Sequence, residues 1–394
     1  MLPRNRVMTN VSLMIATLLF LFFIAEIVLR FFPVNEGFNF QTVNANSWIF
    51  RSEPKERLVQ YSTRFNFKLA NKKKVNGEGF LNIKNYLGRK DRNNRTLVSV
   101  VGDSYIEAAS VRDIDTFYYH LDQSSKALDV YSFGFSGAPL SQYLMWANYS
   151  KINYDNQGLV INIVGNDFDE SLKKYKFAGG FHYYEEQPSG DLDLVRADFT
   201  QRCQRNYWGP KKFLDCHILL KSSLFRYLIY NMKMLAVLSD FKNLIRNILP
   251  DESPEKFLGN VSAQVSQERE QDSYLAIDAF FRDLPELSGL KENQILFIVD
   301  GIRGDRIYKS KLFTDTHKKS YFEKMRGYFF NRANEYGYEY IDMNPIFLQH
   351  FKKHGKKFEF PFDAHWNDTA HKLVAEKIKS SAFWGRMIEK EVAQ

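Results

Sequence analysis

The feature that most constrains the fold is a series of short apolar runs rich in β-branched residues, separated by longer segments with helical periodicity. The apolar runs cover residues 96–101, 129–133, 159–164, 295–299 and 338–341. Helical patterns cover residues 116–125, 140–152, 321–335 and 369–382. Runs that are apolar along nearly their whole length suit strands buried on both faces, as in a parallel sheet. The alternation therefore predicts a doubly wound α/β fold with a mainly parallel, five-stranded sheet flanked by helices.

The third and fourth apolar runs are separated by about 130 residues, far more than one crossover connection needs. This interval contains both cysteines, Cys203 and Cys216, and two further helical patterns, at residues 224–248 and 266–284. We interpret residues 168–290, approximately, as an insertion within a single α/β domain that extends over residues 95–394. In an oxidising compartment the two cysteines could form a disulfide or remain two thiols, and the sequence leaves both open.

The beginning of the chain contains one long apolar segment, Val11–Leu29, with few polar groups. At about 1.5 Å per residue it is roughly 28 Å long, which is close to the thickness of the hydrocarbon core of a bilayer. Its apolar core is longer than that of a cleaved signal peptide, and no good small-residue cleavage site follows it. We therefore predict that residues 1–32 form a cytoplasmic tail and a transmembrane signal anchor.

The charges around this segment predict its orientation. Arg4 and Arg6 precede it, whereas only Arg30 follows it closely, and basic residues favour the cytoplasmic side. A single-pass protein of the cytoplasmic membrane is expected, with its main domain on the extracytoplasmic, periplasmic side. Residues 33–94 are polar and contain the basic run Lys72–Lys74, so we interpret them as a spacer that leads into the domain.

The overall charge and motif content exclude several classes of partner. Lys and Arg number 54 against 46 Asp and Glu, and this excess of +8 is too small and too dispersed to indicate nucleic-acid binding. The glycine-rich phosphate-binding motifs are missing from the sequence, so a nucleotide cofactor is not expected. Two cysteines provide no zinc framework. We expect no cofactor, no metal and no nucleic-acid partner.

Small polar clusters follow the first three apolar runs, and a fourth cluster precedes the last helical pattern. The clusters are Gly102–Ser104, Gly134–Gly137, Gly165–Asp167 and Asp363–Asn367. The carboxyl ends of the strands in a parallel sheet lie along one edge, where ligand sites form. The four clusters are therefore expected to converge on one crevice.

The residue types in these clusters suit acyl transfer. A serine at a strand-to-helix turn is exposed, but it is a poor nucleophile until a base removes its proton, and His365 is the histidine best placed to do this for Ser104. Asp363 could orient the imidazole and stabilise its protonated form. The backbone N–H groups of Ser104 and Gly137 and the side-chain amide of Asn166 could donate hydrogen bonds to an oxyanion.

Taken together and in this order, the four clusters resemble the Ser, Gly, Asn and His blocks of the SGNH (GDSL) hydrolases. The resemblance covers residues from about 95 to 382, interrupted by the insertion. It implies an SGNH-like fold in which Ser104 is the nucleophile, His365 the general base and Asp363 its orienting partner. It also implies that the three donors named above form the oxyanion hole. Members of the family often place the aspartate three residues before the histidine, whereas the separation is two here.

These observations predict a membrane-anchored serine esterase that acts on acyl esters, with acetyl esters of a cell-surface glycan as the expected substrate. If a sugar hydroxyl accepts the acyl group instead of water, the chain is an O-acyltransferase of a surface polysaccharide and needs a membrane acyl-donor partner. A non-catalytic glycan-binding protein of the same fold is the third alternative. No residue in the sequence decides between hydrolysis and transfer.

Overall fold

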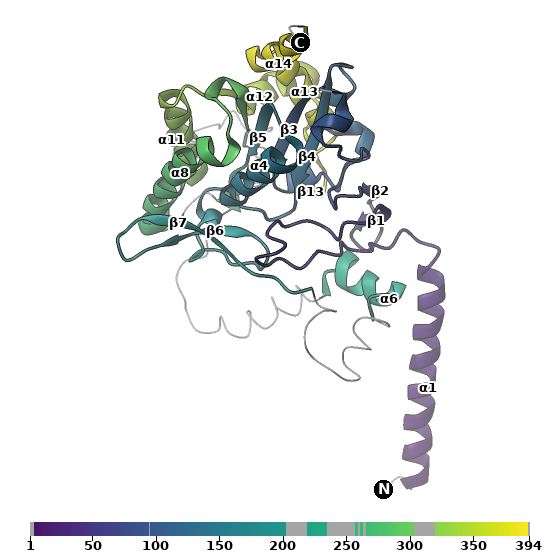
Figure 1. Ribbon diagram of the computed structural model, residues 1–394. Coiled ribbons are helices and arrows are strands. Elements are labelled where there is room, and N and C mark those ends of the chain that lie inside the picture. The colour runs from purple at the N-terminus through teal and green to yellow at the C-terminus, as the bar shows by residue number, and fades with distance from the viewer. Residues whose placement is uncertain are drawn as a thin grey trace. The chain divides into compact units, whose positions relative to one another are not determined.

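The computed structural model describes residues 4–93, 95–201, 219–234, 257–258, 261–262, 265–302 and 320–392. The chain divides into two compact units. The first unit comprises Met1–Asn39, Leu58–Lys73 and Gln201–Glu252 and contains the N-terminal helix. The second comprises Phe40–Arg57, Lys74–Thr200 and Ser253–Gln394 and contains the main sheet (Figure 1).

The second unit is built on a five-stranded sheet with the order β11-β10-β5-β3-β4, in which every pair of neighbours is parallel. The strands are β3 (Thr96–Gly102), β4 (Leu128–Gly134), β5 (Gly158–Ile163), β10 (Ile295–Val299) and β11 (Glu339–Asp342). The five apolar runs of the sequence correspond to these strands, so the predicted fold class is confirmed. Because β4 and β5 lie on opposite sides of β3, the winding direction changes at β3, and such a switch point leaves a crevice at the carboxyl ends of the strands.

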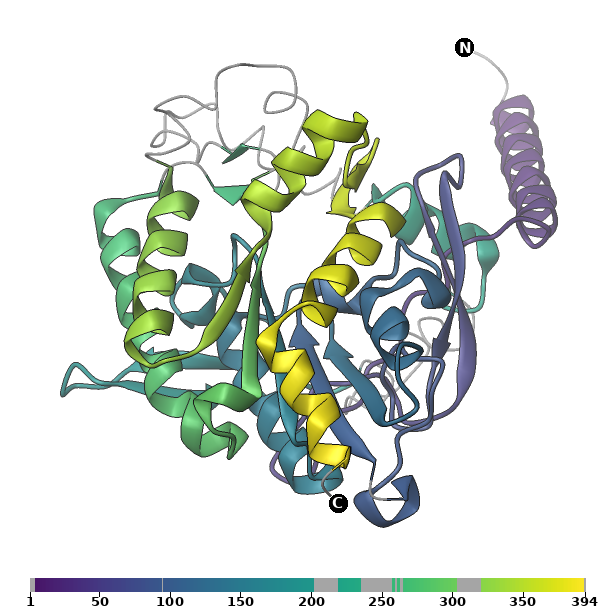
Figure 2. The same ribbon diagram turned by 90° about the horizontal axis from the view of Figure 1, so that it is seen from above.

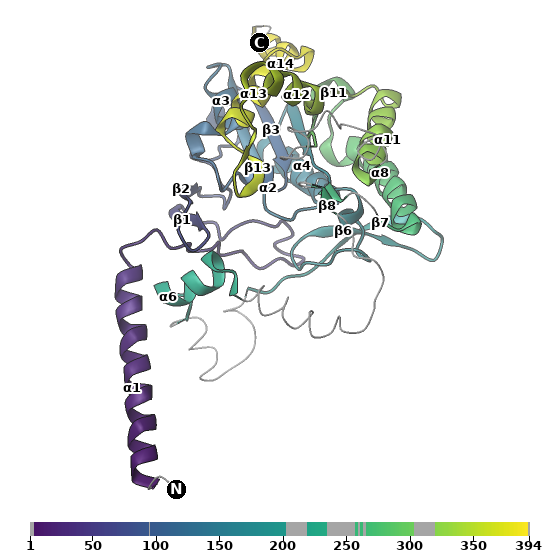
Figure 3. The same ribbon diagram turned by 180° about the vertical axis from the view of Figure 1, so that it is seen from behind.

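Helices cover both faces of this sheet (Figures 2 and 3). Successive side chains along β10 point to opposite faces of the sheet, so their contacts identify the helices on each face. Phe297 contacts Phe281 and Phe329, which come from α8 (Gln267–Ser288) and α11 (Tyr321–Glu335). The neighbouring Leu296 and Ile298 belong to the opposite core, together with side chains of the short helix after β3 and of four other helices. Those four helices are α3 (Phe117–Asp122), α12 (Met343–His354), α13 (Asp368–Lys379) and α14 (Ala382–Val392).

The other helices of the described residues are the long α4 (Leu140–Tyr154) and the short α2 (Ser104–Glu107) and α6 (Ser223–Arg226). Single turns are η1 (Arg89–Arg92), η2 (Asp113–Asp115), η3 (Asp169–Ser171), η6 (Tyr227–Asn231) and η7 (Glu292–Gln294). The two-stranded sheets are β1 (Arg57–Thr63) with β2 (Leu69–Val75), β6 (His182–Glu186) with β7 (Leu192–Arg196), β8 (Phe257–Leu258) with β9 (Val261–Ser262), and β12 (Glu359–Phe360) with β13 (Asp363–Trp366).

The predicted insertion is described only in part. The helix predicted for residues 266–284 is present as α8, and the helix predicted for residues 224–248 begins as α6 and continues into the π-helical turn η6. Residues 235–248 lie outside the described part of the chain, as do Cys203 and Cys216, so the question of a disulfide stays open. The boundaries of the insertion and of the spacer stay predictions.

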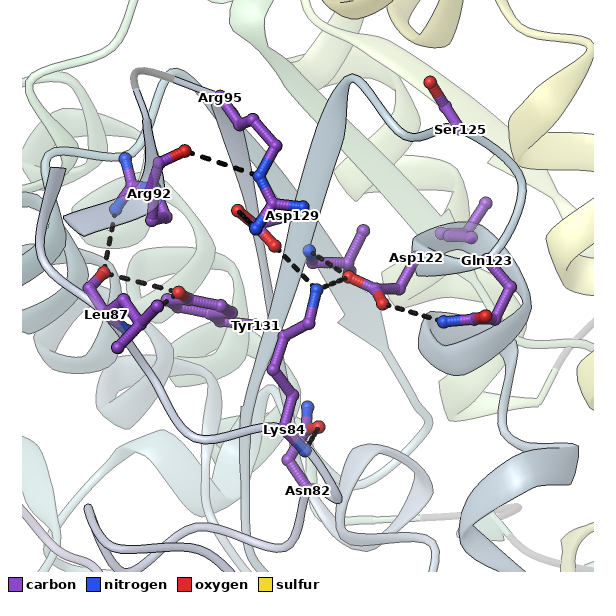
Figure 4. A network of polar contacts seen from close by, with 12 residues as sticks. Asn82, Lys84, Leu87, Arg92, Arg95, Asp122, Gln123, Ser125, Asp129 and Tyr131 are labelled. Atoms are coloured by element: carbon purple, nitrogen blue, oxygen red, sulfur yellow. Dashed lines mark hydrogen bonds and ion pairs between the residues drawn. The ribbon is translucent and has the colours of Figure 1, made fainter. Parts of the chain in front are cut away.

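Part of the predicted spacer is fastened to the edge strand β4 by ion pairs (Figure 4). Lys84 Nζ pairs with Asp122 and lies 2.6 Å from Asp129 Oδ1, and Arg95 lies 3.1 Å from Asp129 Oδ2. The Asp129 side chain is only 1% exposed, and both of its carboxylate oxygens face a cation. Residues 74–93 are therefore packed on the sheet, within the second unit.

The first unit contains α1 (Arg4–Leu29). Within the residues described, one helical segment, Met8–Leu29 of α1, is long and apolar enough to cross a membrane, and none of its most apolar stretch is buried. Length and composition of this kind occur both in membrane anchors and in signal sequences. The retained anchor and the extracytoplasmic side of the main domain therefore stay predictions.

Candidate active site

Ser104 lies at the switch point of the sheet, where β3 ends and α2 begins. The carboxylate of Asp103 caps α2 by accepting a hydrogen bond of 3.0 Å from the backbone N–H of Tyr105. A side chain on Gly102 would not fit, because its Cβ would lie 2.5 Å from Ile106 Cγ1. Ser104 is half-buried between buried neighbours, so its hydroxyl is held at a defined place and remains reachable from solvent.

The three residues predicted to be catalytic are joined by hydrogen bonds. His365 Nε2 lies 2.7 Å from Ser104 Oγ, although 261 residues separate them in sequence. His365 Nδ1 is hydrogen-bonded to Asp363 Oδ1, and Ser110 Oγ donates to Asp363 Oδ2 at 2.5 Å. A carboxylate accepts only, so Nδ1 carries the proton and Nε2 is free to accept the proton of Ser104.

The short strand β13 delivers both His365 and Asp363. Residues two apart on a strand point to the same side, which explains how a separation of two, rather than three, brings both side chains to Ser104. The next residue, Trp366, is buried and donates a hydrogen bond of 2.9 Å to Asp300 Oδ1. Because Asp300 follows β10 directly, this bond fastens β13 to the carboxyl edge of the sheet.

The electrostatics favour a strong base. Burial by itself would raise the pKa of Asp363, but the hydrogen bonds from His365 and Ser110 outweigh burial and lower this pKa to about 2. Burial by itself would lower the pKa of His365, but the adjacent Asp363 carboxylate outweighs burial and raises it. An ionised Asp363 beside His365 therefore increases the affinity of Nε2 for the proton of Ser104.

Two buried carboxyl groups lie behind the serine. Burial raises the pKa of Asp103 to about 6, and Asp103 Oδ2 lies 3.2 Å from Ser104 Oγ as a second, longer acceptor. Asp167 accepts hydrogen bonds of 2.7 Å from Tyr143 Oη and from the Val164 N–H, and burial raises its pKa well above the usual range, with Asp103 contributing. These bonds assign Asp167 a role in holding the loop after β5.

A third buried carboxyl group, Glu107, links α2 to the loop that contains Gly137. Glu107 Oε2 accepts hydrogen bonds from the backbone N–H of Ser136, at 3.0 Å, and from the Ser136 hydroxyl. Burial raises the pKa of Glu107. Since Ser136 directly precedes Gly137, these bonds set the position of the Gly137 loop relative to α2.

The two remaining predicted donors, Gly137 and Asn166, lie beside one ion pair. Asn166 Nδ2 donates a hydrogen bond of 2.9 Å to Glu170 Oε2, and Lys176 Nζ pairs with the same oxygen. Gly137 has a φ of +78°, in the left-handed region, and a Cβ added there would lie 3.6 Å from Lys176 Nζ. Gly137 and Asn166 are thus both placed at the carboxyl edge of the sheet, one after β4 and one after β5.

Four residues around the site were not predicted: Ser110, Glu107, Glu170 and Lys176. Glu170 follows Asn166 by four residues, a spacing that could have suggested a local hydrogen bond. The contacts of the other three depend on how loops fold over the sheet edge, and no sequence pattern marks them.

The described residues contain no group of three or more His, Cys, Asp or Glu side chains that could hold a metal ion. The residues around Ser104 offer acid–base groups and hydrogen-bond donors. The expectation that the protein uses neither a metal nor a cofactor stays a prediction.

No family model matches the chain, and no curated protein matches it. The chain is similar to the solved structure of a member of the lipolytic protein G-D-S-L family from Veillonella parvula DSM 2008, with 10% identity and a TM-score of 0.34, over 73% of this chain and 98% of that chain. It is also similar to the lipase Lip_vut3 from a goat rumen metagenome, with 10% identity and a TM-score of 0.36, over 73% of this chain and 98% of that chain.

A third similar structure is LAE5, described as an alpha/beta hydrolase enzyme from the metagenome of Lake Arreo, Spain, with 11% identity and a TM-score of 0.35, over 72% of this chain and 94% of that chain. The Veillonella protein bears the name of the family that the four sequence clusters resemble. Similarities at identities and TM-scores this low do not assign a function to this chain.

Proposed function

We propose that the chain is a serine ester hydrolase with Ser104 as its nucleophile. One observation carries the proposal: the unbroken series of hydrogen bonds from Asp363 through His365 to Ser104, at the carboxyl edge of a parallel sheet. A serine used only as a helix cap needs no imidazole acceptor on its hydroxyl and no carboxylate behind that imidazole.

The reaction has two halves. Ser104 Oγ attacks the ester carbonyl carbon while His365 Nε2 takes the hydroxyl proton, and the tetrahedral intermediate carries a negative oxygen. His365 then gives the proton to the departing alcohol oxygen, which leaves the acyl group bonded to Ser104. Water attacks this acyl-enzyme, gives its proton to His365 and releases the carboxylic acid, and the proton returns to Ser104.

The negative oxygen needs donors already in place. The backbone N–H groups of Ser104 and Gly137 supply two in this proposal. The side-chain amide of Asn166 has two N–H bonds, and only one of them is needed for Glu170, so the other is available to the oxyanion.

We place the substrate among acetyl esters of an extracytoplasmic glycan, with the chain anchored by α1. The apolar length of α1 and the basic residues before it support this part of the proposal. Hydrolysis is the proposed reaction, and transfer of the acetyl group to a sugar hydroxyl is the outcome that would replace it.

A fluorophosphonate probe tests the nucleophile. The wild-type protein should be labelled, Ser104→Ala should not be labelled, and Ser189→Ala, which alters an exposed serine of the β6–β7 turn, should be labelled like the wild type. A folded wild-type protein that takes up no probe would overturn the proposal.

A second assay separates hydrolysis from transfer. Acetate release from p-nitrophenyl acetate is measured with and without added oligosaccharide, and the sugars are analysed by mass spectrometry. Hydrolysis predicts free acetate and unmodified sugar, whereas acetylated sugar would assign the chain to the acyltransferases.

A further inference from the structure

A cavity of about 320 Å³ lies in the first unit, at the carboxyl end of α1. Three cationic side chains line it, Arg30, Lys72 and Arg226, together with the carboxylate of Glu36. Its apolar lining includes Leu29, the last residue of α1. The cavity therefore combines positive charge with an apolar side that continues into the surface of α1.

The cations are incompletely neutralised. Arg226 lies 3.6 Å from the Glu36 carboxylate, and Arg30 pairs with Glu26 at 3.0 Å. Among the residues that the structure describes, Lys72 has no carboxylate partner. Three cations thus face two carboxylates, which leaves one positive charge for a ligand.

Arg226 also holds an unused donor. Its Nη2 donates to Ser223 Oγ at 3.2 Å, but its Nε is buried and has no hydrogen-bond partner among the residues that the structure describes. A buried N–H group without a partner is costly, and an oxygen of a bound anion would satisfy it. The guanidinium fork is well suited to phosphate oxygens.

The hydrogen bonds of Glu26 show which part of α1 lies beside the cavity. The Glu26 carboxylate accepts hydrogen bonds from Ser222 Oγ at 2.8 Å, the Leu224 N–H at 2.9 Å and the Ser223 N–H at 3.2 Å. These bonds fasten the segment that contains Arg226 to the last turn of the apolar helix. When α1 spans a bilayer, its end at Leu29 lies at the level of the lipid headgroups.

We propose that this cavity binds the phosphate headgroup of an anionic phospholipid, with Arg30, Lys72 and Arg226 around the phosphate and the acyl chains lying along α1. The adjoining Phe31, with 85% of its surface exposed, would lie against lipid in the same arrangement. The proposal rests on α1 being retained in the membrane, and it is independent of the chemistry at Ser104.

Native mass spectrometry of the full-length protein tests the site. The protein is released from nanodiscs that contain equal parts of phosphatidylcholine and phosphatidylglycerol, and the lipids that remain bound are counted. The wild type should retain phosphatidylglycerol in preference to phosphatidylcholine. Lys72→Ala should reduce that retention about fivefold, because it removes one cation at the headgroup level, and Arg226→Gln should reduce it at least as much.

Lys68→Ala is the matched control, because Lys68 is an exposed lysine of the same β1–β2 hairpin that does not line the cavity. Its lipid retention should equal that of the wild type, and circular dichroism of every variant shows that the chain is folded. Equal retention of the two lipids, or retention unaffected by Lys72→Ala, would overturn the proposal.

Two further measurements distinguish the ways in which the lipid proposal could be wrong. If inorganic phosphate displaces the bound phosphatidylglycerol, the cavity is a site for free phosphate and the lipid assignment is wrong. If alkaline carbonate extracts the protein from membranes, α1 is no anchor and the lipid site fails with it. Neither result affects fluorophosphonate labelling of Ser104, so the hydrolase proposal is tested separately.

Discussion

The side-chain amide of Asn166 donates a hydrogen bond of 2.9 Å to Glu170 Oε2, the same oxygen that pairs with Lys176. This bond fixes the orientation of a proposed oxyanion donor, but it also places a carboxylate close to where negative charge would develop. A bare carboxylate there would oppose the reaction, since like charges in a partly buried site repel each other. Lys176 neutralises it.

The first prediction follows from that charge balance. Lys176→Met should lower kcat for p-nitrophenyl acetate by about tenfold or more, because Glu170 would then face the oxyanion without compensation. Adding Glu170→Gln to Lys176→Met removes the opposing charge and keeps an acceptor for Asn166, so kcat should recover. A double variant no better than Lys176→Met would mean that Lys176 acts through local folding and not through charge.

The second prediction concerns the acid limb of the pH profile. His365 must be neutral to accept the proton of Ser104, and Asp363 raises the pKa of His365, so kcat/KM should fall as the pH decreases through that raised value. Asp363→Asn removes the carboxylate. The acid limb should then move to lower pH while the maximal kcat drops by about a thousandfold or more, because the imidazole loses its orienting acceptor. An unmoved limb would show that the titrating group is not His365.

Much of the sheet and the grouping of Ser104, His365 and Asp363 could be predicted, because both depend on local sequence patterns. Buried parallel strands are apolar along most of their length, and small polar clusters such as the one that contains Ser104 follow them at the carboxyl edge. The Glu170–Lys176 pair could not be predicted, because its place beside Gly137 depends on the path of the loop after β5.

The contacts of residues 74–93 are a second feature that the sequence did not predict. The polar composition of this segment suggested a spacer, yet Lys84 is bound to Asp129, a residue 45 positions later, and Phe80 is fully buried. Composition describes the segment by itself. The composition of a segment contains no information about a distant carboxylate on β4. Ion pairs between residues far apart in sequence therefore cannot be predicted from local patterns.

The third prediction concerns stability and Asp103. A carboxyl group whose pKa is raised from 3.8 to about 6 by burial binds its proton more tightly in the folded chain, so stability falls as the pH rises through this window. The loss amounts to about 3 kcal/mol above pH 6. Asp103→Asn keeps a helix-capping side chain without the charge, so its Tm should match that of the wild type near pH 4 and exceed it near pH 8. Equal Tm values at both pH values would contradict the burial of an ionised Asp103.

The fourth prediction compares two ion pairs that differ in burial. Asp129→Ala removes the buried carboxylate that Lys84 and Arg95 share, and the loss of these charged contacts should cost about 1.5–3 kcal/mol in the free energy of unfolding. Arg89→Ala breaks the pair with Asp155, in which both side chains are more than half exposed, and should cost about 1 kcal/mol or less. Urea denaturation of the two variants measures both values in one protein. If Asp129→Ala cost no more than Arg89→Ala, residues 84–95 would not be held on β4 by charge, and the apolar packing of Phe80 would have to account for their attachment.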